Sequence, residues 1–345
     1  MERKTNKLDS IQVLRGIAVL LVIAFHFRVY LNGVYAQKDL GDILFGIGEV
    51  GVDIFFVISG FIITYSSMNK AKNRPMVFAA KRFFRLYPVY FIILTLAIYL
   101  NYEAIYTSSQ IIKSYLLIPI DYNFIGPWSG YSIIIPAWTL TYEIWFYVVF
   151  FFSLCISHKY RTAIASFLLI IICVLGQLYF HGDVFLNPIA QPPSGDGIIR
   201  NLVFVSNPII YDFILGMIIA EAYIRLPSRL INKMPVVQFL NITLAIALLF
   251  FMSRVKEWTW NCSMGGAYSF MIIAPIVLIS KCRDVYRNKI LTYVGEISYS
   301  LYINHMVVYS LAVLYLKPYG VLDSKGFGVF SSYDLRYFYY INHIL

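Results

Sequence analysis

Residues 11–31 read IQVLRGIAVLLVIAFHFRVYL, a long apolar run that is interrupted by Arg15 and His26. A helix needs about 20 predominantly apolar residues to cross the hydrocarbon core of a bilayer, and this segment has that length. It therefore predicts a transmembrane helix. Ionisable side chains within a bilayer are costly and usually functional, so Arg15 and His26 are candidate site residues from the outset.

The rest of the chain repeats this apolar pattern. Of its 345 residues 59% are hydrophobic and 13% charged, whereas soluble domains have about 45–50% and about 25%. Eight further segments approach the length of a membrane span: 54–66, 88–100, 138–157, 162–180, 209–224, 236–252, 266–280 and 297–316. We therefore predict an all-α fold, a polytopic transmembrane bundle of nine spans that forms one membrane domain over residues 1–345. We expect the tail at 317–345 to be either a degenerate tenth helix or a truncated last helix.

The formal net charge of +10 follows the predicted topology. Basic residues occur before the first span and then in every second loop: Arg3, Lys4, Lys7, Lys70, Lys72, Arg74, Lys81, Arg82, Lys159, Arg161, Arg225, Arg229, Lys233, Lys281, Arg283, Arg287 and Lys289. By the positive-inside rule these loops and the N-terminus are cytoplasmic. A nucleic-acid partner is not predicted, because it requires basic residues on one aqueous patch.

Arg15 and His26 are expected on one helix face at different depths. They are eleven residues apart, which is a rise of about 16 Å and an angular offset of about 20°. The same topology places Asp53 of GVDIFFVISGF and Glu143 of PAWTLTYEIWFY at the depth of His26. One imidazole and two carboxylates are the groups from which a general base is built. Alternatively, each of these side chains only forms a hydrogen bond to a neighbouring helix.

Two arginines are expected at the depth of Arg15. Arg82 and Arg85 lie in KRFFRLYPVYF, at the cytoplasmic start of the third span. Three guanidinium groups at one depth can bind phosphate. Alternatively, the positive-inside bias alone explains why Arg82 and Arg85 lie there, without a role in binding.

The remaining candidates lie on later spans. His305 lies about two turns into the last predicted span, with Tyr302 near the same face, and Tyr142 precedes Glu143. A packed histidine that bonds a tyrosine or a backbone carbonyl is the alternative for His305. Ser59 of VISGF is expected as a close-packing residue. The scattered cysteines and the remaining histidines show no metal-ligand spacing, so no metal is predicted.

Five motifs on five spans resemble the integral membrane acyltransferase-3 family. They are LRGIAVLLVIAFHF, GVDIFFVISGFII, KRFFRLYPVYF, PAWTLTYEIWFY and GEISYSLYINH, in the order typical of that family, and the resemblance covers residues 8–316. It implies transfer of an acyl group, usually acetyl, from cytoplasmic acyl-CoA to a hydroxyl of a cell-surface polysaccharide or lipopolysaccharide, which can be lipid-linked. It also implies an integral protein of the bacterial plasma (inner) membrane.

The resemblance gives the candidate residues roles. Arg15, Arg82 and Arg85 would bind the donor, acetyl-CoA or another acyl-CoA. His26 would act as general base or as transient acyl carrier, oriented by Asp53 or Glu143. The alternative function is a transporter or flippase that uses the same buried charges as a proton relay.

Overall fold

Helices account for every regular element in the part of the chain that this computed structural model describes, which is residues 9–69, 74–100, 106–190, 195, 197–253, 262–282 and 288–316. The α-helices are α1 (Asp9–Phe27), α2 (Leu40–Phe45), α3 (Val50–Ser66), α4 (Pro75–Leu100), α5 (Ser108–Tyr115), α6 (Trp138–Ile156), α7 (Arg161–His181), α8 (Tyr211–Arg225), α9 (Ser228–Ile231), α10 (Met234–Ser253), α11 (Cys262–Ser280), α12 (Lys289–Glu296) and α13 (Ser298–Leu316). Short 3-10 helices are η1 (Arg28–Leu31), η2 (Gly46–Glu49), η3 (Ile135–Ala137), η4 (Ile198–Ser206) and η5 (Pro208–Ile210). The all-α prediction is confirmed for these residues.

Several of these helices have the length and composition of membrane spans. Five segments of the described residues qualify: Asp9–Leu31, Leu40–Ser66, Pro75–Leu100, Ile135–Ile156 and Arg161–His181. A sixth is the pair Ile198–Ser206 and Pro208–Arg225, if a pair bent by 51° counts as one span. A polytopic helical membrane protein is therefore confirmed, but the predicted number of nine spans is not. The predicted tenth helix at 317–345 lies outside the described residues.

Two predicted boundaries were wrong. The third span was expected to begin at residue 88, but α4 begins at Pro75 and continues through Pro88. Membrane helices tolerate an internal proline where neighbouring groups satisfy the freed carbonyl. Arg82 and Arg85 consequently lie inside a helix, where the three-residue spacing puts them on adjoining positions of one face. The second span was expected to begin at residue 54, but α2, η2 and α3 extend it back to Leu40.

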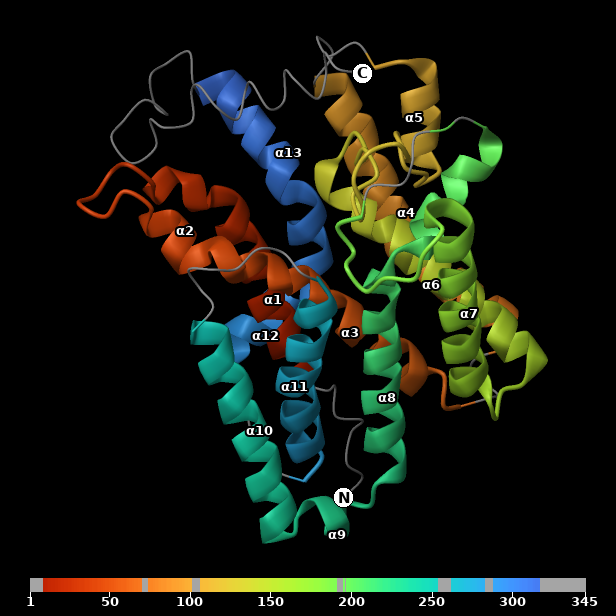
Figure 1. Ribbon diagram of the computed structural model, residues 1–345. Helices are drawn as coiled ribbons and strands as arrows, with labels where there is room; N and C mark the ends of the chain where they lie inside the picture. Colours follow the sequence, from red (N-terminus) through yellow and green to blue (C-terminus); the bar gives the residue numbers. More distant parts are fainter. Residues whose placement is uncertain are drawn as a thin grey trace.

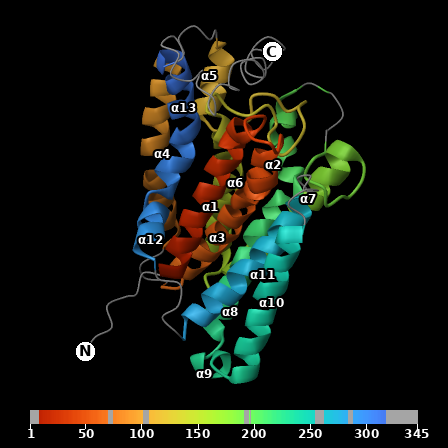
Figure 2. The same cartoon turned by 90° about the vertical axis from the view of Figure 1, so that its left-hand side faces the viewer.

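Helix α3 is the centre of the packing, in contact with α1, α8 and α11. The backbones of α3 and α8 approach closely because each places a glycine at the contact. A Cβ on Gly60 would lie 3.1 Å from Cα of Phe213, and one on Gly216 would lie 2.8 Å from the carbonyl carbon of Val57. Small residues at helix contacts allow this close packing in membranes. Figures 1 and 2 show the resulting bundle, with α13 beside α4.

Several basic residues lie where helix ends meet at one end of the bundle. Ser10 at the start of α1 donates to Ser280 at the end of α11 (3.0 Å). Lys281 then donates to the carbonyl of Leu226, beyond the end of α8 (2.7 Å). In both Figure 1 and Figure 2, α9 lies at this lower end and α5 at the opposite one. Arg225, Arg229 and Lys281 therefore share one end of the molecule.

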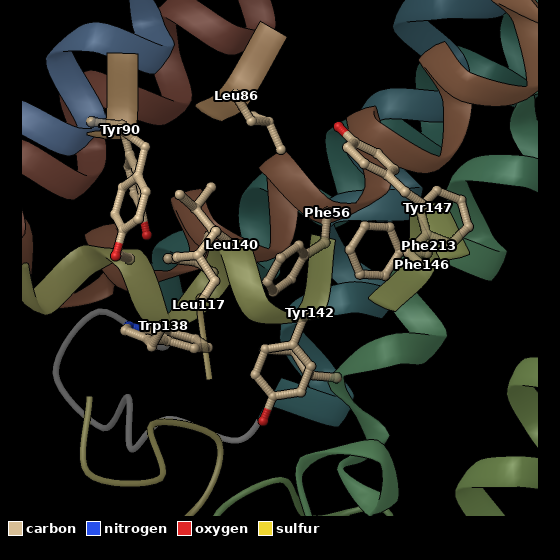
Figure 3. Packing of buried hydrophobic residues seen from close by; sticks show 14 of the residues in the cluster. Phe56, Leu86, Tyr90, Leu117, Trp138, Leu140, Tyr142, Phe146, Tyr147 and Phe213 are labelled. Atoms are coloured by element: carbon tan, nitrogen blue, oxygen red, sulfur yellow. The ribbon is translucent and has the colours of Figure 1, made fainter. Parts of the chain in front are cut away.

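Aromatic rings fill the core between α3, α6 and α8. The rings of Phe56 and Phe213 are 4.8 Å apart, and those of Phe146 and Phe213 are 4.4 Å apart. Figure 3 shows these side chains meeting beside Tyr142, whose hydroxyl donates to the carbonyl of Pro127 (2.8 Å). This packing holds α6 against the face of α3 next to the one that α8 covers.

Candidate functional site

Two cavities lie beside α1, one near Arg15 and one near His26. The first has a volume of about 60 Å³, and we call it the arginine cavity. It is lined by Arg15, Val52, Phe55, Phe56, Ile58, Ser59, Ile62, Arg85, Leu86, Thr139, Leu140, Glu143, Ser298, Tyr299 and Tyr302. The second, the histidine cavity, has about 520 Å³. It is lined by Val22, Phe25, His26, Phe27, Arg28, Val29, Glu49, Val52, Phe124, Ile125, Trp128, Tyr131, Ile135, Pro136, Trp138, Tyr302, Met306 and Tyr309. Arg15 and His26, which were predicted at different depths on one helix, thus line two different cavities.

Glu143 is the acidic residue of the arginine cavity. Its Oε1 accepts hydrogen bonds from the Ser59 hydroxyl (3.3 Å) and, at short range, from the Tyr147 hydroxyl. Its charge also interacts with those of Arg15 and Arg82. A carboxylate among guanidinium groups offsets part of their charge without closing the cavity. Glu143 therefore holds Ser59 and Tyr147 by hydrogen bonds and acts on the arginines through its charge.

The three arginines come from two helices and are held differently. Arg15 donates to the side-chain oxygen of Gln12, one turn earlier on α1 (3.2 Å). Arg85 lines the arginine cavity from α4. Arg82 donates to the Ser66 hydroxyl (2.9 Å), and its guanidinium lies 5.7 Å from the centre of the Tyr147 ring. The predicted grouping of Arg82 and Arg85 with Arg15 is thus found around Glu143 and Tyr147, although Arg82 does not line the cavity.

His26 lies beside a second imidazole at the histidine cavity. The rings of His26 and His305 are 4.9 Å apart, so α13 does bring His305 to the site. Nδ1 of His26 lies 2.8 Å from the carbonyl oxygen of Val22, and Nδ1 of His305 lies 2.7 Å from that of Tyr302. A carbonyl oxygen only accepts, so in each ring Nδ1 carries the hydrogen and Nε2 of the neutral ring is an acceptor. Nε2 of His305 has no hydrogen-bond partner among the described residues.

The wall of the histidine cavity is largely aromatic. Trp128 and Tyr131 stack with their ring centres 6.0 Å apart, and Trp138 lines the cavity from the start of α6. The polar members include His26 and Arg28, and the guanidinium of Arg28 already pairs with Asp42 (2.8 Å). A few polar groups in a concave, mostly apolar space of this size are typical of a site for a small molecule or a sugar residue.

The predicted cluster of His26, Asp53 and Glu143 is not what the structure shows. Asp53 is fully buried on the α8 side of α3, where its carboxyl faces that of Asp212. A Cβ on Gly265 of α11 would lie 2.7 Å from the Asp53 carboxyl. Successive residues of a helix point about 100° apart, so Val52 lines both cavities while Asp53 turns away from them. Equal depth in the membrane did not place these residues together.

Tyr142 and Ser59 also differ from their predicted places. Tyr142, a candidate site residue, lines neither cavity and packs instead into the aromatic core. Ser59, expected only to pack helices, lines the arginine cavity and bonds Glu143. A signal for Ser59 was present in the sequence, because positions 52, 55, 56 and 59 share one face of a helix. Those four residues all line the arginine cavity.

Metal ligands do not gather in the described part of the chain. No group of three or more His, Cys, Asp or Glu side chains there can hold a metal ion. The chemistry these residues offer is anion binding at the arginines and proton transfer at the imidazoles.

Comparison with known proteins identifies the family. The sequence profile of the acyltransferase-3 family, described as an acyltransferase domain, matches residues 8–333. The chain belongs to the acyltransferase-3 family. The resemblance carried by the five motifs is therefore confirmed, and with it the prediction of an acyltransferase enzyme in a membrane.

The curated relatives of this acyltransferase are distant. The exopolysaccharide production protein ExoZ of Rhizobium meliloti (strain 1021) is 24% identical over 77% of this chain and 78% of its own length. The peptidoglycan O-acetyltransferase OatA of Listeria monocytogenes is 27% identical over 89% of this chain. A Staphylococcus aureus (strain COL) protein named as an O-acetyltransferase is 23% identical over 91% of this chain. The chain spans about half the length of the last two, 50% and 52%. No solved structure matches it.

Proposed function

We propose that this acyltransferase moves an acetyl group from cytoplasmic acetyl-CoA to a hydroxyl of a cell-surface glycan, in the plasma (inner) membrane of a bacterium. The observation that carries the proposal is that α1 places Arg15 in one cavity and His26 in another. An anionic donor and a neutral acceptor need different surroundings. The names of the relatives, which refer to an exopolysaccharide and to peptidoglycan, support a glycan as the acceptor.

The orientation follows from the basic residues. Arg225, Arg229 and Lys281 share the end of the bundle at which α1 begins. The positive-inside rule makes this end cytoplasmic. The arginine cavity then lies nearer the cytoplasm, where acyl-CoA is supplied, and the histidine cavity lies nearer the outer surface, where the glycan is found.

Each residue then has a role in the transfer. Arg15, Arg82 and Arg85 bind the donor through charge-assisted hydrogen bonds, and the charge of Glu143 offsets part of theirs. The acceptor sugar lies against the aromatic wall of the histidine cavity. Nε2 of His26 takes the proton of the acceptor hydroxyl as its oxygen attacks the thioester carbonyl. The C–S bond breaks, and the same proton leaves on the CoA thiol. His305 faces His26 and stabilises the charge or passes the proton on.

A labelling experiment tests this function. Membranes from cells that express the protein are incubated with acetyl-CoA labelled in the acetyl group, and label is measured in the extracted glycan. We expect label with the wild type and almost none with His26→Ala. A matched control is His158→Ala, since His158 lines neither cavity and its Nε2 bonds the carbonyl of Ser67 (2.8 Å).

Two results would contradict the proposal. An unlabelled glycan with the well-folded wild type would overturn the function itself. Equal labelling by the wild type and His26→Ala would leave the function standing but remove His26 from the chemistry.

A further inference from the structure

Residues 128–131, which read WSGY, form a turn with an unusual backbone. Ser129 (φ 45°), Gly130 (φ 76°) and Tyr131 (φ 62°) are three consecutive residues in the left-handed region. Residues that carry a Cβ enter this region at a cost, and they normally do so singly. Where such a conformation is kept, the surrounding contacts impose it, and it is often found at a binding site. What this turn holds in place is two aromatic side chains, at its first and last positions.

The neighbouring chain fixes the turn. The nitrogen of Asp121 donates to the carbonyl of Ser129 (3.2 Å). Only glycine fits at the next position, because a Cβ on Gly130 would lie 2.6 Å from that same nitrogen. The carbonyl of Pro127, just before the turn, accepts a hydrogen bond from Tyr142 in the aromatic core (2.8 Å). The turn is thus tied to α6 and is a fixed part of the fold.

The turn directs two aromatic residues to the histidine cavity. Trp128 and Tyr131 both line it, and the planes of their stacked rings differ by 26°. Both side chains are half-buried, so their packing on the core leaves part of each one open to the cavity. We call these two rings the aromatic platform. His26 lines the same cavity from α1, so the aromatic platform and the proposed general base share one space.

The chemistry of the aromatic platform favours one kind of sugar. The face of an aromatic ring is apolar and carries partial negative charge. It disfavours phosphate and carboxylate groups but packs well against C–H bonds. A pyranose with mostly equatorial hydroxyls has C–H bonds on its faces, whereas its hydroxyls point outward around the rim. A pyranose that lies flat on the platform therefore keeps its hydroxyls free for His26, and an open-chain polyol has no such face.

We propose that Trp128 and Tyr131 form a subsite for a neutral pyranose, on which the acceptor sugar lies flat while one of its equatorial hydroxyls receives the acyl group. The proposal rests on the proposed function and names the class of its acceptor, which is a glycan of neutral pyranose residues and not an open-chain polyol phosphate. In the transfer, the hydroxyl oxygen forms the ester bond, the C–S bond of the donor breaks, and the hydroxyl proton ends on the CoA thiol. The platform holds the sugar and takes no part in the chemistry.

Saturation-transfer NMR tests the subsite without acyl transfer. The purified protein, in a detergent without a sugar headgroup, is mixed with methyl β-glucopyranoside or with ribitol, and the transfer of saturation from the protein to each probe is measured. We expect a signal from the glucoside, stronger for the ring hydrogens of one face than for those of the other, and none from ribitol. Equal signals from the two probes, or none from the glucoside, would overturn the proposal.

Two substitutions of the same kind locate the subsite. Trp128→Ala should weaken binding of the glucoside by about fivefold, which is typical of the loss of one aromatic contact. Trp145→Ala is the matched control, because Trp145 lines neither cavity and packs edge-on against Phe204, with 6.2 Å between the ring centres. It should leave binding unchanged, and an equal loss in both variants would count against the subsite.

A third variant separates loss of the ring from loss of the fold. Trp128→Phe keeps an aromatic ring and should retain most of the glucoside signal. Circular dichroism of each variant shows whether it is folded. Loss of the signal in folded Trp128→Phe, or its full retention in folded Trp128→Ala, would contradict stacking on this ring.

The outcomes also distinguish this proposal from the proposed function. Labelled glycan together with an absent glucoside signal would contradict the subsite alone. Glucoside binding that is weakened in Trp128→Ala, without any labelled glycan, would support the subsite and contradict acyl transfer. A signal from the alkyl chain of the detergent that Trp128→Ala removes, with none from the glucoside, would make the cavity a lipid site and overturn the proposal.

Discussion

Replacing Gly216 by alanine should force α3 and α8 apart. The added Cβ would lie 2.8 Å from the carbonyl carbon of Val57 and 2.9 Å from the nitrogen of Phe61. Nonbonded carbons prefer separations of about 3.5–4.0 Å, so the carbonyl carbon alone requires a shift of at least roughly 0.7 Å. The carbonyl oxygen of Val57 would lie closer still and requires a larger shift. The atoms in the way belong to the backbone of α3, and no side-chain rotation can remove the overlap.

The expected cost is at the upper end of the range for overpacked cores. Such changes destabilise proteins by about 1–3 kcal/mol, and we expect about 3 kcal/mol here because a whole helix must move. Helix α3 also carries Val52 and Ser59, so the same shift should lower acyl transfer. Thermal unfolding of the detergent-solubilised protein, followed by circular dichroism, measures the first effect, and the labelling assay measures the second.

Gly46→Ala provides the control for this prediction. Gly46 has helical backbone angles (φ −56°), and a Cβ there would meet no atom within 4 Å. Alanine at such a position stabilises a protein by about 0.4–1 kcal/mol through the unfolded state. A Gly216→Ala protein that unfolds at or above the temperature of Gly46→Ala would refute the view that α3 and α8 are in backbone contact.

Two further predictions concern the charged residues. Asp53→Asn should leave acyl transfer intact and the unfolding temperature unchanged or higher, because the amide can donate to the carboxylate of Asp212. A loss of activity in a variant of normal stability would return Asp53 to the catalytic site. Arg15→Ala should weaken acetyl-CoA binding by about 10- to 100-fold, the loss of a charge-assisted hydrogen bond of about 1.5–3 kcal/mol, whereas exposed Arg229→Ala should not. Calorimetric titration of the purified protein with acetyl-CoA measures both arginine variants, and unaltered affinity in Arg15→Ala would exclude Arg15 from donor binding.

Much of the fold and part of the site follow from local sequence. The length of an apolar run determines whether a helix can span a bilayer, and 297–316 was predicted within one residue of α13, Ser298–Leu316. Helical periodicity depends only on the chain itself, so the common face of Arg15 and His26 and their separation of about 16 Å could be derived without a partner helix. The order of the five motifs was sufficient to identify the family.

Only the tertiary structure decided which face of each helix meets the site. Sequence and topology place Asp53 and Glu143 at a depth in the membrane, but depth is one coordinate, and rotation about the helix axis is another. That rotation is set by contacts between residues far apart in the chain. Gly60 and Gly216 bring α3 against α8, which turns Asp53 toward Asp212 and leaves Val52 and Ser59 facing the cavities. No local pattern specifies such a contact, because it depends on how two backbones fit together.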